Sequence, residues 1–135
     1  MTTVKLSKNL QNPRGVYSIP VTPFHENGKL DLDSLRKCIE FCLEKGAHGI
    51  VMPVNASEVS TLTDEERTQV IKEGVKSVNG SVHFVAGVTG NSIEQVQESV
   101  KIVEDLGVDS IITMPSTKIA SAQYVYDYFL SLIHI

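Results

Sequence analysis

Polar groups that can hydrogen-bond a small anion follow two short apolar runs of the sequence. The run over residues 49–54 is followed at once by Asn55, Ala56 and Ser57. Asn55 offers an amide, Ala56 only a backbone N–H, and Ser57 a hydroxyl, so an amide at the first position cannot relay a proton as a hydroxyl would. Thr22 ends an earlier apolar run and is expected to face the same region.

Two further features near these groups admit both a chemical and a structural interpretation. Glu58 is either a buried carboxylate that acts on protons or a residue that holds its loop. The segment Gly-Val-Thr-Gly-Asn-Ser at 87–92 precedes a predicted helix, where a phosphate can bind, but it lacks the lysine of a P-loop. We therefore interpret it as a tight strand-to-helix turn in which Ser92 caps the helix.

The sequence predicts neither a metal site nor a cofactor. The four histidines have no i,i+4 or other clustered spacing. Cys38 and Cys42 lie four residues apart on a predicted helix, but two thiols alone make a poor metal site, and both fit a buried helix face as small apolar residues. A reducing cytoplasm is the expected compartment.

Short apolar runs alternate with amphipathic stretches along the chain. The runs predict strands over residues 15–21, 49–54, 82–88 and 110–114. Helical spacing predicts a helix after each strand, over residues 31–45, 63–78, 92–106 and 120–132, with possible capping boxes at Thr63/Glu66 and Ser92/Gln95. Four β-α units in a row imply parallel strands, in either an open doubly wound sheet or half of a (β/α)8 barrel.

Composition excludes several classes of function. The 135 residues have a formal net charge of −4, with 41% hydrophobic and 21% charged residues, as in ordinary globular chains. Because lysine and arginine do not cluster, a nucleic-acid or anionic-membrane partner is not expected. No apolar run approaches the roughly 18 residues that span a bilayer, and residues 1–11 lack the apolar region of a signal peptide.

Several short motifs occur in the order and spacing of one enzyme family. They are GVYSIPVTPF at 15–24, GAHGI at 46–50, VNASE at 54–58, GVTGNS at 87–92 and the helical segment at 120–129. VNASE takes the place of the family signature Gly-(Thr/Ser)-Thr-Gly-Glu. From about residue 14 to residue 129, the chain resembles the dihydrodipicolinate synthase/N-acetylneuraminate lyase family.

The resemblance implies a (β/α)8 barrel with its site at the carboxyl ends of the strands. Family members join a lysine to pyruvate or another 2-keto acid as a Schiff base, an electron sink that permits aldol cleavage, aldol condensation or dehydration of a keto-deoxy acid. The resemblance implies no metal or organic cofactor, and a homo-oligomer at full length. It also implies that Asn55, Ala56 and Ser57, with Thr22 nearby, contact the keto-acid carboxylate.

Two departures from the family pattern shape this prediction. Asn55 and Ala56 stand where the family has two hydroxyl residues, and Ser116 and Thr117 stand where it has a hydroxyl-aromatic pair. These changes favour a divergent member over dihydrodipicolinate synthesis itself. The family's catalytic tyrosine and Schiff-base lysine lie on its fifth and sixth strands, beyond the four predicted units, so we assign no catalytic residue to this chain.

We therefore predict an α/β fold, the N-terminal half of a (β/α)8 barrel over residues 14–129. Residues 1–13 are interpreted as an extension, and residues 130–135 as a non-native tail, since they do not resemble the family. The chain is predicted to be an inactive piece of a lyase whose complete form takes a small 2-keto acid. The alternative is a non-catalytic half-barrel that self-associates to bury its sheet edges. A barrel enzyme for phosphorylated substrates is disfavoured, because phosphate sites typically follow strands seven and eight.

Overall fold

A computed structural model describes residues 13–116 and 121–133, so most of the predicted extension and the last two residues of the predicted tail lie outside the described residues. The predicted alternation of four strands with four helices is confirmed. The elements are β1 (Tyr17–Ser18), α1 (Leu32–Glu44), β2 (Gly49–Met52), the 3-10 helix η1 (Asn55–Ser57), α2 (Asp64–Val78), β3 (His83–Gly87), α3 (Ile93–Asp105), β4 (Ser110–Ile112) and α4 (Ala122–Leu130).

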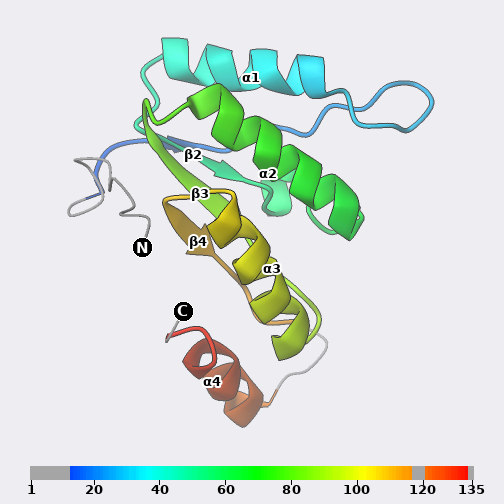
Figure 1. The fold of residues 1–135 in the computed structure, drawn as a ribbon, viewed down its shortest axis with the longest axis vertical. Helices are drawn as coiled ribbons and strands as arrows, with labels where there is room; N and C mark the ends of the chain where they lie inside the picture. The colour runs from blue at the N-terminus through cyan, green and yellow to red at the C-terminus, as the bar shows by residue number, and fades with distance from the viewer. Residues whose placement is uncertain (1–12, 117–120, 134–135) are drawn as a thin grey trace.

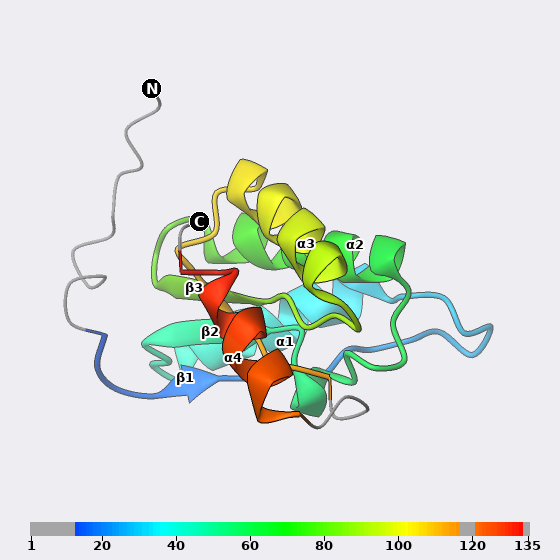
Figure 2. The ribbon, with the colours of Figure 1, turned by 90° about the horizontal axis from the view of Figure 1, so that it is seen from below.

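The four strands form one parallel sheet in the order β1-β2-β3-β4. The helices follow one another in the same order along the molecule, from α1 to α4 (Figure 1). Seen from below, α4 lies in front of the strands and α1 behind them (Figure 2). A doubly wound sheet reverses its strand order at a switch point, whereas this order runs on without reversal, as in half of a barrel.

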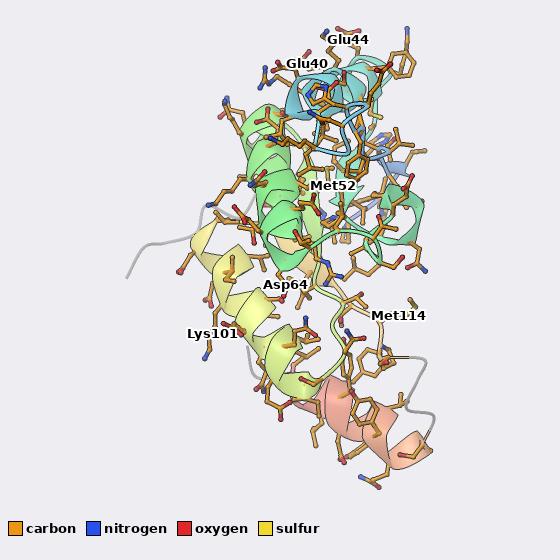
Figure 3. All side chains as sticks on the ribbon, turned by 90° about the vertical axis from the view of Figure 1, so that its right-hand side faces the viewer. Glu40, Glu44, Met52, Asp64, Lys101 and Met114 are labelled. Atoms are coloured by element: carbon orange, nitrogen blue, oxygen red, sulfur yellow. The ribbon has the colours of Figure 1, made fainter. Side chains whose placement is uncertain are left out.

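The hydrophobic core lies between the helices and the outer, convex face of the sheet. Met52 lies in this interior, whereas Glu40 and Glu44 of α1 and Lys101 of α3 lie on the outer surface (Figure 3). Alternate residues of the strands supply the sheet side of the core, as expected from the period of two in a strand. The buried set includes Ile50, Met52, Phe84 and Ala86 from the strands and Leu35, Ile39, Val70, Ile71, Val96 and Val100 from the helices.

All four strands are shorter than the sequence predicts, and prolines follow the shortened β1 and β2. β1 contains only Tyr17 and Ser18, since Pro20 has no N–H to donate to its neighbour. β2 stops at Met52, directly before Pro53, and the chain then turns into η1. The sequence did not predict η1, which consists of Asn55, Ala56 and Ser57, the three residues expected to contact the keto-acid carboxylate.

Helix α4 is fastened to the sheet by one buried aromatic residue. Tyr128 is 0% exposed, donates a hydrogen bond from its hydroxyl to the Met114 carbonyl (3.1 Å), and contacts the Thr113 hydroxyl. The helix starts after Ser121, whose side chain accepts from the Tyr124 N–H (3.1 Å), and it is shorter than the predicted 120–132. The packing of α4 therefore depends strongly on this single phenol.

The two predicted capping boxes have different outcomes. At α2 the box is complete: Glu66 N–H donates to the Thr63 hydroxyl (3.2 Å), and Thr63 N–H donates to the Glu66 carboxylate (2.8 Å). At α3 only Gln95 N–H donates to Ser92 (3.2 Å). The amide oxygen of Gln95 reaches one residue further back and accepts from Asn91 N–H (2.8 Å). The predicted return bond from the Gln95 side chain to the Ser92 N–H is replaced by this bond to Asn91, so the second half of the predicted capping box at α3 is wrong.

Thr63→Ala is expected to lower the free energy of unfolding by about 1 kcal/mol, the usual cost of losing an N-cap side chain. Urea unfolding followed by circular dichroism measures the change. Thr63→Ser is the control, because it keeps the hydroxyl that caps α2. Equal losses in both variants would show that the cap does not stabilise α2.

Candidate functional site

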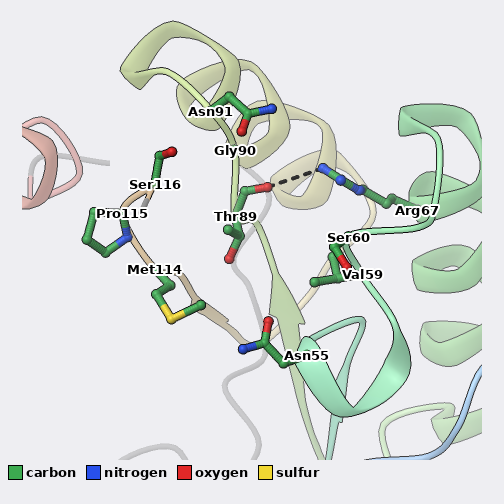
Figure 4. Close-up of a pocket in the computed structure, with 10 residues that line it drawn as sticks. All are labelled: Asn55, Val59, Ser60, Arg67, Thr89, Gly90, Asn91, Met114, Pro115 and Ser116. Atoms are coloured by element: carbon green, nitrogen blue, oxygen red, sulfur yellow. Dashed lines mark hydrogen bonds between the residues drawn. The ribbon is translucent and has the colours of Figure 1, made fainter. Parts of the chain in front are cut away.

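The carboxyl ends of β2, β3 and β4 meet at one edge of the sheet, where two cavities lie. The larger, of about 440 Å³, is lined mainly by polar residues from three loops (Figure 4). The smaller, of about 340 Å³, is mainly apolar and includes Ile19 and Ile112. Asn55, Thr89 and Met114 line both cavities. This is the edge where the sequence analysis expected the site.

Asn55 and Ala56 are both exposed and both line a cavity. The Asn55 side chain points into the space between Met114 and Thr89 (Figure 4). Ala56 lines the smaller cavity, and no hydrogen bond from its N–H to another described residue is found. The structure therefore places the Asn55 amide at the cavities, and the next residue, Ala56, lines the smaller one.

Ser57 and Thr22 lie beside the predicted site, but their hydroxyls are already used. Ser57 is fully buried and donates to the Pro20 carbonyl (2.9 Å). Thr22 is 4% exposed and donates to the Ser57 carbonyl (2.7 Å). The Ser57 N–H donates to the Val54 carbonyl (2.9 Å). Neither Ser57 nor Thr22 lines the two cavities, so both act as supports that fasten η1 to the chain after β1.

Arg67 is the one charged residue among the described residues that line the larger cavity. Its Nη1 donates to the Thr89 carbonyl (3.2 Å) and lies 3.6 Å from the exposed Asp64 carboxylate. Its Nε is buried and has no hydrogen-bond partner among the described residues. A partly buried guanidinium favours an anion nearby. The sequence analysis did not name Arg67 as a site residue, although the pair Glu66-Arg67 matches a family motif downstream of the signature and lies in the first turn of a helix that starts at this edge.

The structure favours the second interpretation of Glu58, as a residue that holds its loop. It is exposed, ends η1 in the left-handed region (φ 60°), and donates from its N–H to the Asn55 carbonyl (3.0 Å). Glu58 lines neither of the two cavities. A carboxylate in this position is solvated, so the interpretation as a buried group that acts on protons does not fit the structure.

The segment at 87–92 forms the expected tight turn. Ser92 caps α3, and Thr89, Gly90 and Asn91 line the larger cavity. Gly87 allows the closest approach in this turn: a Cβ added there would lie 1.8 Å from the Pro53 carbonyl oxygen. The absence of a side chain at this position lets the ends of β2 and β3 come together beneath the cavities.

Searches for a metal-binding cluster and for a membrane-spanning helix cover the described residues. Within residues 13–116 and 121–133, no group of three or more His, Cys, Asp or Glu side chains is placed to hold a metal ion. Over the same ranges, every helix is too short or too polar to cross a bilayer. Cys38 and Cys42 are free thiols and only half-buried, so the prediction that they lie on a buried helix face is confirmed only in part.

Known proteins that match this chain point to one family. A family model described as the dihydrodipicolinate synthetase family matches residues 12–134. The 4-hydroxy-tetrahydrodipicolinate synthase of Methanococcus maripaludis (strain C5) is 39% identical over 99 residues, which cover 73% of this chain and 34% of that protein. A probable 5-dehydro-4-deoxyglucarate dehydratase of Streptomyces avermitilis is 36% identical over 110 residues, which cover 82% and 33%.

Solved structures agree with these sequence matches. A dihydrodipicolinate synthase from Bacillus clausii aligns with a TM-score of 0.85 and 27% identity, over 96% of this chain and 43% of that one. Another dihydrodipicolinate synthase aligns with a TM-score of 0.83 and 33% identity, over 88% and 41%. The chain thus spans about a third of the curated relatives' length. Its fold is the N-terminal half of their (β/α)8 barrel, as predicted.

Proposed function

This chain belongs to the dihydrodipicolinate synthetase family, and from that premise we propose that it is the keto-acid-binding part of a lyase. In the proposed reaction a lysine condenses with pyruvate or another 2-keto acid, with loss of water, to form a Schiff base. The iminium withdraws electrons from the adjacent carbon, so that an aldol bond forms or breaks, or a keto-deoxy acid loses water. No metal or organic cofactor takes part.

The lysine and a catalytic tyrosine belong, in this proposal, to the further β-α units of the complete protein. The matched regions make up only 34% of a curated relative and 41% of a solved one. The residues described here therefore supply binding and not covalent chemistry. A cytoplasmic location is part of the proposal, and the free thiols of Cys38 and Cys42 fit a reducing compartment.

The position of Asn55 between the two cavities carries the proposal. An ionised carboxylate only accepts hydrogen bonds, and the Asn55 amide and the Ala56 N–H are adjacent donors. The guanidinium of Arg67 adds positive potential in the larger cavity. The apolar side chains of the smaller cavity, including Ile19 and Ile112, suit the carbon chain of the acid.

We infer the substrate class from the absence of a hydroxyl at position 55. A hydroxyl can pass a proton between neighbours, whereas an amide at the same position only holds its hydrogen bonds. Ser57 does not replace the missing hydroxyl, because it donates to Pro20 and is fully buried. We therefore propose a keto-deoxy acid dehydratase or aldolase in preference to dihydrodipicolinate synthesis. One relative of this chain is named as a probable 5-dehydro-4-deoxyglucarate dehydratase (36% identical), beside synthases such as that of Methanococcus maripaludis (39% identical), so the preference rests on Asn55 and Ser57.

Asn55→Asp is expected to weaken keto-acid binding strongly. The change removes the amide donor and sets a carboxylate against the carboxylate of the ligand; a hydrogen bond to a charged group contributes about 1.5–3 kcal/mol, or roughly tenfold to hundredfold in affinity. The test joins this chain to the C-terminal part of the Methanococcus maripaludis relative. Borohydride trapping of pyruvate is then measured by mass spectrometry as a function of pyruvate concentration.

Asn27→Asp is the matched control for that experiment. It adds the same charge in the exposed turn at residues 25–28, and the aspartate oxygen can still accept from the Lys29 N–H as Asn27 does (3.1 Å). The control should trap pyruvate at the same concentration as the unaltered hybrid. If the unaltered hybrid folds but traps no pyruvate, the proposed Schiff-base function is contradicted. If the hybrid traps pyruvate and the two variants behave alike, the proposed role of Asn55 is contradicted.

A further inference from the structure

The larger cavity extends well away from Asn55. Its walls come from the loops that follow β2, β3 and β4 and from the first turn of α2, so three consecutive β-α units line it. Asn55 and Asn91 lie at opposite ends of the cavity, and the side chain of Arg67 reaches in from α2 (Figure 4). The volume of about 440 Å³ lies within the roughly 300–1,000 Å³ of typical ligand pockets. A substrate held at Asn55 therefore has room to extend beyond its keto group.

Arg67 keeps hydrogen-bonding capacity at this cavity. Its side chain is 23% exposed, and its only hydrogen bond to a described residue is the one from Nη1 to the Thr89 carbonyl (3.2 Å). Nη1 also lies 3.6 Å from the Asp64 carboxylate, but Asp64 is 79% exposed, and an ion pair so open to solvent contributes little. Nε is buried without a partner among the described residues. Because a guanidinium has five N–H donors, Arg67 can still donate to a ligand.

The other polar groups around Arg67 are neutral. Asn91 and Ser60 line the cavity and are exposed, and neither side chain hydrogen-bonds another described residue. No Asp or Glu is among the described residues that line the cavity. An anion there meets one positive charge, neutral donors and no negative wall, which favours a group with a single negative charge.

We propose that Arg67 binds a second carboxylate at the far end of the substrate, so that the keto acid is a dicarboxylate. The inference rests on the proposed function, in which Asn55 holds the carboxylate beside the keto group, and it names the substrate class of that site. One guanidinium balances the single charge of a carboxylate, whereas a phosphate ester carries about −1.5 to −2 at neutral pH. Asn91 and Ser60 are the neutral donors at the same end of the cavity as Arg67. Arg67 then discriminates keto diacids from keto monoacids.

Two keto acids that differ only at the far end test this assignment. 2-Oxoglutarate has the second carboxylate, and 2-oxopentanoate has a methyl group in its place. Borohydride trapping by the hybrid with the Methanococcus maripaludis relative is measured by mass spectrometry as a function of the concentration of each acid. Half-maximal trapping is expected at a concentration of 2-oxoglutarate roughly tenfold to hundredfold lower than that of 2-oxopentanoate, the usual effect of a hydrogen bond to a charged group.

Arg67→Gln is expected to abolish this preference, because it removes the charge but keeps an N–H that can donate to the Thr89 carbonyl. Arg67→Lys should keep part of the preference, since the charge remains. Arg14→Gln is the matched control: Arg14 is exposed and lines neither cavity, so loss of the same charge there should leave the preference unchanged. If Arg67→Gln fails to fold by circular dichroism, Asn91→Asp takes its place, since its carboxylate would repel the second carboxylate of the substrate.

The possible outcomes separate this inference from the proposed function. A hybrid that traps pyruvate but has the same half-maximal concentration for both test acids overturns the role of Arg67 and leaves the Schiff-base proposal standing. A preference for 2-oxoglutarate that survives Arg67→Gln overturns that role as well. Inorganic phosphate that competes with 2-oxoglutarate more strongly than glutarate does would assign the cavity to a phosphate and overturn the dicarboxylate. A folded hybrid that traps no keto acid at all overturns the proposed function and the substrate class together.

Discussion

Gly87→Ala is expected to lower the free energy of unfolding by about 3 kcal/mol or more, the upper part of the range for overpacking a core. The added Cβ would lie 1.8 Å from the Pro53 carbonyl oxygen and 2.9 Å from its carbon. These are backbone atoms, and β3 cannot move away because it is paired on both sides, to β2 and β4. Urea unfolding followed by circular dichroism measures the loss.

Gly80→Ala is the control for Gly87→Ala. Gly80 has a left-handed backbone (φ 71°) with no atom within 4 Å of the added Cβ, so the substitution costs only the conformational strain, about 1–2 kcal/mol. Gly87→Ala should also loosen the turn at residues 87–92, which lines the larger cavity. If the two alanine variants unfold at the same urea concentration, the close approach at Pro53 does not limit packing.

Tyr128→Ala is expected to cost about 3–5 kcal/mol, as for other large aromatic residues removed from a core. The side chain is fully buried, and its hydroxyl is bonded to the Met114 carbonyl. Tyr126→Ala on the same helix is the control, because Tyr126 is 63% exposed and should change stability by no more than about 0.5 kcal/mol. Thermal unfolding of both variants compares the two sites directly. Similar losses would mean that α4 is not anchored through Tyr128.

The same phenol gives this chain an alkaline limit. Burial raises the pKa of Tyr128 above the usual value near 10, although the Thr113 hydroxyl opposes the shift. The folded state therefore holds the proton more tightly than the unfolded state, and stability falls as the pH rises through and beyond about 10. Tyr128→Phe should remove part of this decline. An identical pH profile for both proteins would assign the decline to other groups.

The helices were predictable because their signals are local. The N-cap at Thr63 and its reciprocal Glu66 lie within one turn, and the apolar spacing of α1 to α3 shows on the sequence itself. Strand lengths were less predictable, because a ladder requires backbone N–H donors on both neighbouring strands, and Pro20 and Pro53 have no N–H. The choice between a barrel and a doubly wound sheet came from motif order, since periodicity alone is the same in both.

The site was predictable in place but not in detail. The tripeptide at 55–57 lies at the expected edge, yet Ser57 and Thr22 face backbone carbonyls of distant segments, which no local pattern reveals. Arg67 enters the larger cavity because the turn at residues 87–92 lies against the start of α2. Contacts of this kind arise from the convergence of separate loops, so only the folded chain shows them.

The contact between Tyr17 and Gly49 restricts the order in which substitutions can accumulate at these two positions. The ring occupies the space of a side chain at 49, so a tyrosine at 17 is tolerated only where glycine already stands at 49. With a small side chain at position 17, the Cβ of an alanine at 49 would still lie 3.0 Å from the His83 carbonyl oxygen. A path through sequence space that changes position 49 first passes through an overpacked protein, whereas one that changes position 17 first gives up the 2.7 Å hydrogen bond between the Tyr17 hydroxyl and His83 Nδ1.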